Sequence, residues 1–237
     1  NDSNINHTSS DGQKFNIKSS IDSTNAGFSF KYFGTAKGVS VYTFIDESHK
    51  LFYSTVINVS ERESGYVIDG LMHNDVVKSD IHSTDTHGYS EVIFGLTHLL
   101  GFSFAPRIKN FKEQQLYAFE AKKEYHKLGY KVLPIKQINT ELIEEQWENI
   151  LRFVLTIKER ETTASQLLKR LTSYPKQHKT YLALREFGRI IKTKFLLEYI
   201  DDVTVKVMSG MMLSRLGNKL ADKGLAGFEF ATGIPGS

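Results

Sequence analysis

The stretch V-S-V-Y-T-F-I-D-E-S-H-K-L-F-Y-S-T-V-I-N-V, residues 39–59, decides the fold class of this chain. Residues 39–46 and 51–59 are rich in β-branched and aromatic side chains, and a short polar segment separates them. Two such runs around a polar turn predict an antiparallel hairpin, here with its turn at residues 47–50. The N-terminal part of the chain is therefore expected to be built on a β-sheet.

Shorter patterns on both sides of the hairpin extend this sheet and add helices. Ser90 is a suitable N-cap, Gly101 a suitable helix end, and Pro106 is expected at or beyond a sheet edge. The expected elements are a strand ending near Asp11, a helix at 65–73, a strand at 81–85, a helix from Ser90 to Gly101 and a strand at 102–108. This order predicts an α/β fold, a ribonuclease-H-like mixed sheet with helices on its faces.

The second half of the chain predicts helices. Two apolar stripes with steps of three and four mark them: Ile143, Trp147, Ile150, Val154 and Ile157, then Leu184, Phe187, Ile191 and Phe195. T-A-S-Q at 163–166 matches a capping box, and Pro175 fits a first helical turn. We therefore expect a core at 1–138, a basic helical insertion at 139–205 and an atypical tail at 206–237, where six glycines and a weak pattern follow Met208.

Composition narrows the kinds of protein that this chain represents. Its 237 residues are 40% hydrophobic and 24% charged, as in an ordinary globular domain. The absence of Cys excludes disulfides and thiolate zinc sites. No run of 18 apolar residues is free of charge, so we expect a soluble intracellular protein without a membrane partner. Because the chain begins at Asn1 rather than Met, we expect a piece of something longer.

Positive charge is concentrated in the helical half. The net charge is only +3, but residues 150–200 contain eleven Lys or Arg against four Glu. A solvated helical face and a nucleic-acid surface both explain such an excess. The segment includes Arg185, Arg189 and Lys192.

Two aspartates are the strongest candidates for chemistry. Asp11 lies in S-S-D-G and Asp85 in S-T-D-T-H-G, each after a strand-like run and shortly before Gly. Two carboxylates at one sheet edge can hold divalent metal ions for phosphoryl transfer. The alternative is that both are turn aspartates, since Asp is common before Gly.

Other clusters are weaker candidates. His82, Asp85 and His87 could be drawn as a zinc site, but a strand places His82 and Asp85 on opposite faces. His98, within an apolar helix, is more typical of a hydrogen-bonded core histidine. Arg107 and Lys109 follow a predicted strand end close to Asp85, so they are either a phosphate clamp or ordinary surface cations.

Five ordered motifs together resemble the catalytic region of the Tn3 family, the replicative class II bacterial transposases. They are S-S-D-G-Q-K-F at 9–15, Y-V-I-D-G-L at 66–71, S-T-D-T-H-G-Y at 83–89, H-L-L-G-F-S-F-A-P-R-I at 98–108 and L-R-E-F-G-R-I at 184–190. This set spans most of the chain and is far more specific than any single Asp-Gly pair.

The resemblance implies a DDE transposase that cleaves and joins DNA strands at transposon ends. Asp11 matches the first catalytic acid and Asp85 the second, and both would bind Mg²⁺ or Mn²⁺. Implied partners are DNA and further copies of the enzyme on DNA, in the bacterial cytoplasm at the nucleoid. The helical insertion, with Arg185, Arg189 and Lys192, and the pair Arg107 and Lys109 are then the expected DNA contacts.

The chain departs from the family pattern at the third acid. The family carries a Glu in an L-N-K-G-E-like motif that should fall near position 217, where this chain reads L-S-R-L-G. Asp222 and Glu229 lack the surrounding motif, so we expect a frameshift or truncation. Two hypotheses follow: an active transposase fragment, or a catalytically inactive remnant that binds DNA without sequence specificity.

Overall fold

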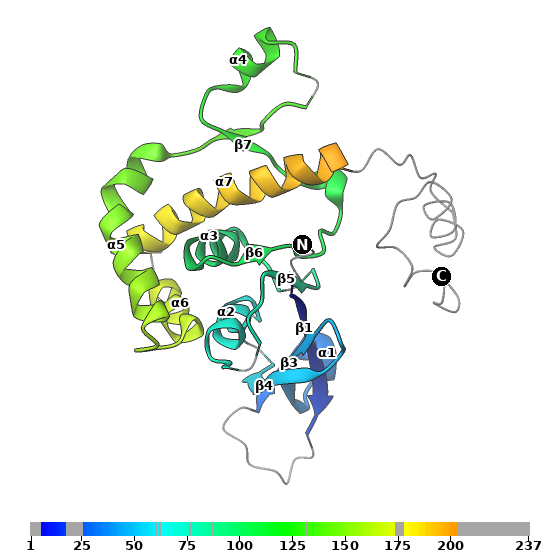
Figure 1. The fold of residues 1–237 in the computed structure, drawn as a ribbon. Helices are drawn as coiled ribbons and strands as arrows, with labels where there is room; N and C mark the ends of the chain where they lie inside the picture. The colour runs from blue at the N-terminus through cyan, green and yellow to red at the C-terminus, as the bar shows by residue number, and fades with distance from the viewer. Residues whose placement is uncertain are drawn as a thin grey trace, which may run out of the picture. The chain divides into compact units, whose positions relative to one another are not determined.

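The protein has a mixed sheet with helices packed against it, as the sequence predicted (Figure 1). The computed structural model describes residues 6–17, 26–59, 61, 63–75, 77–86, 88–130, 132–173 and 178–202. The main sheet contains β1 (His7–Asn16), β2 (Gly27–Phe28), β3 (Lys37–Asp46), β4 (Leu51–Asn58), β5 (Ile81–Thr84) and β6 (Ser103–Phe104). Its order is β2-β3-β1-β5-β6, and β4 also pairs with β3.

Strand directions agree with a ribonuclease-H-like arrangement. β3 runs antiparallel to β1 and β4, whereas β5 is parallel to β1 and β6 is parallel to β5. The helices are α1 (Phe30–Phe33), α2 (Ser64–Met72), α3 (Glu91–Leu100), α4 (Lys122–Lys127), α5 (Thr140–Lys158), α6 (Ala164–Thr172) and α7 (Lys179–Asp202), with a 3₁₀ turn η1 (Phe111–Glu113). A two-stranded ribbon joins β7 (Tyr117–Ala118) to β8 (Lys136–Gln137).

The hairpin and two of the predicted helix starts are confirmed. β3 and β4 pair in one register from Val39 with Asn58 to Phe44 with Tyr53, and the register shifts before Ile45 pairs with Leu51. The Ser90 hydroxyl accepts a hydrogen bond from the Ile93 N–H at the start of α3, and Gly101 ends that helix in a left-handed conformation. At α6 the Thr163 hydroxyl caps the Gln166 N–H, but the Gln166 side chain bonds Thr162 rather than completing the box.

Two strand predictions were wrong in their limits. β1 does not end near Asp11 but continues to Asn16, because residues 8–16 pair with β3. The strand predicted at 102–108 is only Ser103–Phe104 by its ladder, although the Ala105 and Arg107 N–H groups still bond the carbonyls of His82 and Thr84. The short elements β2, α1, η1, β7, β8 and α4 were not predicted.

Helices cover one face of the sheet in the part of the chain that the structure describes. Thr8, Ser10, Tyr42 and Phe44 are buried on that face beneath α2 and α3, whereas Asp11 on the opposite face is exposed. The functional consequence is that a side chain on the open face can reach a ligand.

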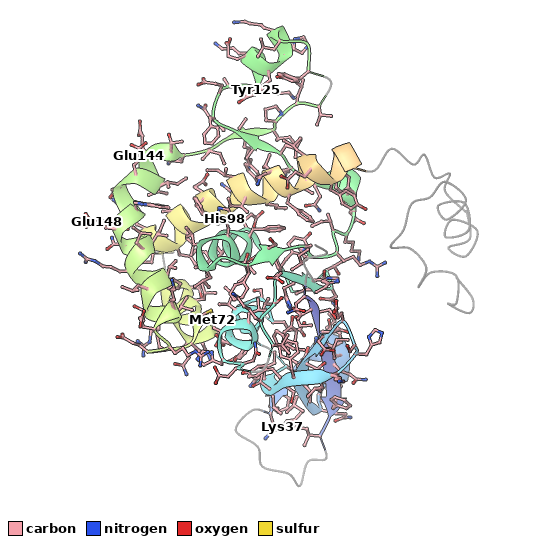
Figure 2. The ribbon with its side chains drawn as sticks, in the orientation of Figure 1. Lys37, Met72, His98, Tyr125, Glu144 and Glu148 are labelled. Carbon is pink, nitrogen blue, oxygen red and sulfur yellow. The ribbon has the colours of Figure 1, made fainter. Side chains whose placement is uncertain are left out.

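One hydrophobic core joins the sheet to the helical half of the chain. Phe44 of β3, Phe94 of α3, Ile150 of α5 and Leu184 of α7 belong to the same buried cluster. α3, on which Figure 2 labels His98, approaches α7 closely. The rings of His98 and Phe187 have centroids 6.1 Å apart. Residues on both sides of position 138 thus share a core, while the division into catalytic core, insertion and tail stays a prediction.

The chain divides by its own contacts after Leu196. Of the second unit, residues 197–237, the structure describes only the last turns of α7. Pro175 and the predicted tail lie outside the described residues.

Candidate functional site

Asp11 and Asp85 occupy equivalent positions on neighbouring parallel strands. β1 and β5 pair from His7 with Ile81 to Ser10 with Thr84, and the two aspartates come next along each strand. Adjacent strands lie roughly 5 Å apart, and side chains at paired positions point to the same face. The fold therefore brings together two carboxylates that are 74 positions apart (85 − 11) in the sequence.

Local geometry explains how each aspartate is presented. The Asp85 carboxylate accepts a hydrogen bond from the Gly88 N–H at 3.1 Å, which closes a tight turn directly after β5. Asp11 instead lies within β1, and its carboxylate accepts from the Gly12 N–H at 2.7 Å. A Cβ at Gly12 would lie 2.7 Å from the Glu63 carboxyl group, so the glycine permits a close approach rather than a turn.

The phenol of Tyr42 lies beneath both acids, and the charges of their carboxylates affect its pKa. Burial raises the pKa of Tyr42, and the carboxylates of Glu63, Asp85 and Asp11 raise it further. A hydroxyl group that remains protonated in this position donates hydrogen bonds without adding a negative charge. It therefore does not compete with the carboxylates for a cation.

His82 has a role that the sequence did not reveal. It is fully buried on the face opposite Asp85, and its two ring nitrogens lie 2.8 Å from Thr8 Oγ1 and 2.9 Å from Ser10 Oγ. The signal available in the sequence was the alternation of polar residues, Thr8 with Ser10 and His82 with Thr84, at positions that point into the core.

The backbone of Arg107 lies near Asp85, and Lys109 follows two residues later. The Arg107 N–H donates to the carbonyl of Thr84 at 2.8 Å, so its backbone runs beside the residue that precedes Asp85. Both side chains are exposed. The structure thus brings the Arg107 backbone to the same strand end as Asp85.

The predicted DNA contacts on α7 are in a different environment. Arg189 pairs with Glu186 and stacks over Tyr117 at 4.7 Å, and Lys192 lies 3.6 Å from Glu91 with its side chain 9% exposed. Arg185 is half-buried on the same helix. These three positions stay predictions as DNA contacts, but Arg189 and Lys192 would first have to leave their internal ion pairs.

Other cations of the basic segment also have acidic partners. Arg160 pairs with Asp75 at 2.8 Å, Lys169 with Glu61 at 2.7 Å and Lys179 with Glu145 at 2.7 Å. Asp75, Glu61 and Glu145 all lie outside residues 150–200. The local excess of positive charge is therefore partly balanced by the fold.

The donor chemistry of the acid pair fits a hard divalent cation. Mg²⁺ and Mn²⁺ prefer carboxylate oxygens and keep several water ligands, and two adjacent Asp side chains on an open sheet face provide such donors. Among the described residues no group of three or more His, Asp or Glu converges on one point.

No helix among the residues that the structure describes is long and apolar enough to span a bilayer.

Comparison with known proteins identifies the family. A model of the Tn3 transposase DDE domain matches residues 2–215. The transposase for transposon Tn1546 of Enterococcus faecium and that for Tn3926 of Escherichia coli are each 38% identical over 217 residues, 90% of this chain and 22% of the relative. The transposase for transposon gamma-delta of Escherichia coli strain K12 is 30% identical over 195 residues, 82% of this chain and 19% of the relative. The chain thus spans about a fifth of the length of these curated relatives, and it belongs to the Tn3 transposase family.

Proposed function

We propose that this chain carries the metal-binding centre of a DNA transposase, with Asp11 and Asp85 as two of its metal ligands. The observation that supports the proposal is the register of β1 on β5, in which Ser10 pairs with Thr84 directly before Asp11 and Asp85. When bound, Mg²⁺ or Mn²⁺ activates the attacking oxygen at a phosphodiester and stabilises the leaving oxygen.

The residues of this chain bind and orient rather than transfer protons. Asp11 and Asp85 would supply carboxylate oxygens directly beyond the last pair of the β1–β5 ladder, so the ladder brings their backbones close together. The Gly88 N–H holds one Asp85 oxygen and thereby limits the rotation of that carboxylate. A preorganised pair of anions has a smaller ordering cost when the cation binds.

DNA is the proposed partner. Arg107 and Lys109 are exposed beside the strand end that carries Asp85, and Arg side chains bind phosphate oxygens in two-pronged geometry. Their contacts with the backbone of DNA would place a phosphodiester against the two carboxylates without reading its sequence.

A second candidate function is binding of DNA without catalysis. It is favoured by the sequence L-S-R-L-G at 213–217, where the family carries its third acid. A site limited to two carboxylates binds divalent ions weakly, because each lost ligand removes both charge and geometry. The two candidates differ in whether this chain nicks DNA, not in where it binds.

Nicking of supercoiled plasmid in Mg²⁺ or Mn²⁺ distinguishes them. An active fragment converts supercoiled plasmid to open circles, and Asp11→Asn or Asp85→Asn lowers this conversion to the level seen in EDTA. Glu47→Gln, at an exposed position of the β3–β4 turn, removes a comparable charge and is expected to leave nicking unchanged. Nicking that persists in both Asp variants refutes the assignment, whereas DNA binding without nicking supports the second candidate.

A further inference from the structure

A chain of buried polar side chains runs beneath the two acids. Ser79 Oγ lies 2.6 Å from Thr8 Oγ1, which lies 2.8 Å from His82 Nδ1, and His82 Nε2 lies 2.9 Å from Ser10 Oγ. Ser10 Oγ in turn lies 3.0 Å from the Tyr42 hydroxyl. All five residues lie on the helix-covered side of the sheet, opposite the open face with Asp11 and Asp85.

The imidazole ring of His82 packs between two phenyl rings that lie roughly parallel to it. Its ring stacks on Phe44 at 5.5 Å with an interplanar angle of 24° and on Phe104 at 6.5 Å with an angle of 11°. The slot between the two phenyl rings fixes the plane of the imidazole. Its two nitrogens therefore point steadily at the Thr8 and Ser10 hydroxyls.

The contacts of His82 join the two strands that carry the acids. His82 belongs to β5, and both of its hydrogen-bonding partners belong to β1. β5 is short, and its ladder with β1 has four register pairs. Beyond the last pair, Asp11 and Asp85 place like charges next to each other, and such charges on paired strands repel. This repulsion acts to separate β1 and β5 just beyond their last register pair, so a further contact between the two strands is needed there.

We propose that His82 is a positioning residue, which bridges to Thr8 and Ser10 and thereby holds Asp11 and Asp85 at the spacing that a divalent cation requires. This inference rests on the proposed function of the two aspartates as metal ligands. His82 is not itself a ligand, because its nitrogens are both occupied, its side chain is fully buried and it faces away from the acids.

Two variants remove the bridge in different ways. His82→Phe keeps an aromatic ring in the slot between Phe44 and Phe104 but removes both hydrogen bonds. Ser10→Ala removes one of them and leaves His82 in place. Ile57→Val, at a buried position of β4, is the matched control because it lowers stability by about 1 kcal/mol without touching the bridge.

Mn²⁺ binding, followed by the electron paramagnetic resonance of free Mn²⁺, gives a readout that does not depend on activity. We expect His82→Phe to weaken Mn²⁺ binding about tenfold, as loss of groups that orient metal ligands commonly does, and Ser10→Ala to weaken it less. Ile57→Val should bind Mn²⁺ as the unaltered chain does. In the metal-free protein, amide hydrogen exchange at residues 81–84 should accelerate in both bridge variants.

The outcomes separate this inference from the proposed function. If Asp85→Asn weakens Mn²⁺ binding but folded His82→Phe and Ser10→Ala do not, the bridge has no positioning role and the metal site stands. If Asp85→Asn has no effect on Mn²⁺ binding, the site is wrong and the inference falls with it. If Ile57→Val weakens binding as much as the bridge variants do, the effect is one of general stability and the inference is refuted.

Discussion

Individual residues at this site are explained by the face of the sheet on which they lie. Asp11 and Asp85 project from the open face, and their neighbours in sequence, Ser10 and Thr84, are buried beneath them. Gly12 accommodates the Glu63 carboxyl group, which itself pairs with Lys14 at 2.6 Å. The S-S-D-G motif therefore forms a strand with a tight contact on one face and an exposed carboxylate on the other.

His82 makes the protein sensitive to acid. Burial, with a smaller contribution from His7, lowers the pKa of His82 to about 3. An unfolded chain has a histidine pKa near 6.5, so between pH 6.5 and pH 3 the unfolded state binds a proton that the native state does not. The stability that the neutral ring supplies above pH 6.5 is lost as the pH falls, by about 1.4 kcal/mol per pH unit within that window.

Urea unfolding at several pH values from 7 to 4.5 measures this loss. We expect the free energy of unfolding of His82→Phe to depend less on pH than that of the unaltered chain, by about 1.4 kcal/mol per pH unit. His98→Gln removes an exposed imidazole from α3 and should keep the original dependence. Equal slopes in the unaltered chain and in His82→Phe would show that the buried imidazole is not held neutral.

At the scale of elements, strong local signals predicted what the structure confirms. The hairpin β3–β4 and the capped helices α3 and α6 follow from β-branched runs, cap residues and apolar periodicity alone. The limits of β1 could not be predicted, because residues 9–14 are polar and their strand conformation comes from pairing with β3 and β5. The same holds for β7 and β8, two residues each, which form through contacts with distant parts of the chain.

The candidate acids were recognisable from sequence, but the layer that supports them was not. Family motifs indicate Asp11 and Asp85, since their surroundings are distinctive. To predict a buried histidine between two phenyl rings, one must know which strands are neighbours. Local patterns in a single sequence do not contain that information. For this reason the sequence indicated no role for His82 except as a weak candidate for a zinc ligand.

The crossing of α3 and α7 depends on a single glycine. A Cβ at Gly188 would lie 1.6 Å from the carbonyl oxygen of Glu91, whereas a Cβ at Gly95 would lie 3.2 Å from its closest neighbours. Gly188→Ala must therefore push the helices apart, and we expect a loss of about 3 kcal/mol or more in the free energy of unfolding. Chemical denaturation measures it.

Gly95→Ala is a milder substitution at the same helix crossing. Its loss in the free energy of unfolding should be distinctly smaller, because neighbouring atoms have to move by only a few tenths of an ångström. Alanine in a helix is intrinsically more favourable than glycine by about 1 kcal/mol. A stabilising effect of Gly188→Ala would therefore show that the two helices are not in close contact.

At the scale of the whole molecule, the distribution of paired and exposed cations limits the surfaces at which DNA can bind. Six basic residues of the segment 150–200 have acidic partners: Arg152, Arg160, Lys169, Lys179, Arg189 and Lys192. Most of these pairs are exposed and contribute little to stability, but each lowers the local positive potential. Arg107 combines exposure with a backbone position beside Thr84, and this favours it over the paired cations as the DNA contact to test first.

Salt dependence of DNA binding tests that preference. Each phosphate contact releases counterions, so removing one lowers the slope of log K against log salt by about one unit. We expect Arg107→Ala to lower both the affinity for a duplex oligonucleotide and this slope, measured by fluorescence anisotropy between 50 and 200 mM salt. Lys50→Ala, at the exposed turn of the β3–β4 hairpin, is the matched control and should change neither. If Arg107→Ala leaves the slope unchanged while Arg189→Ala lowers it and the protein remains folded, then DNA binds along α7 and the internal ion pairs open to receive it.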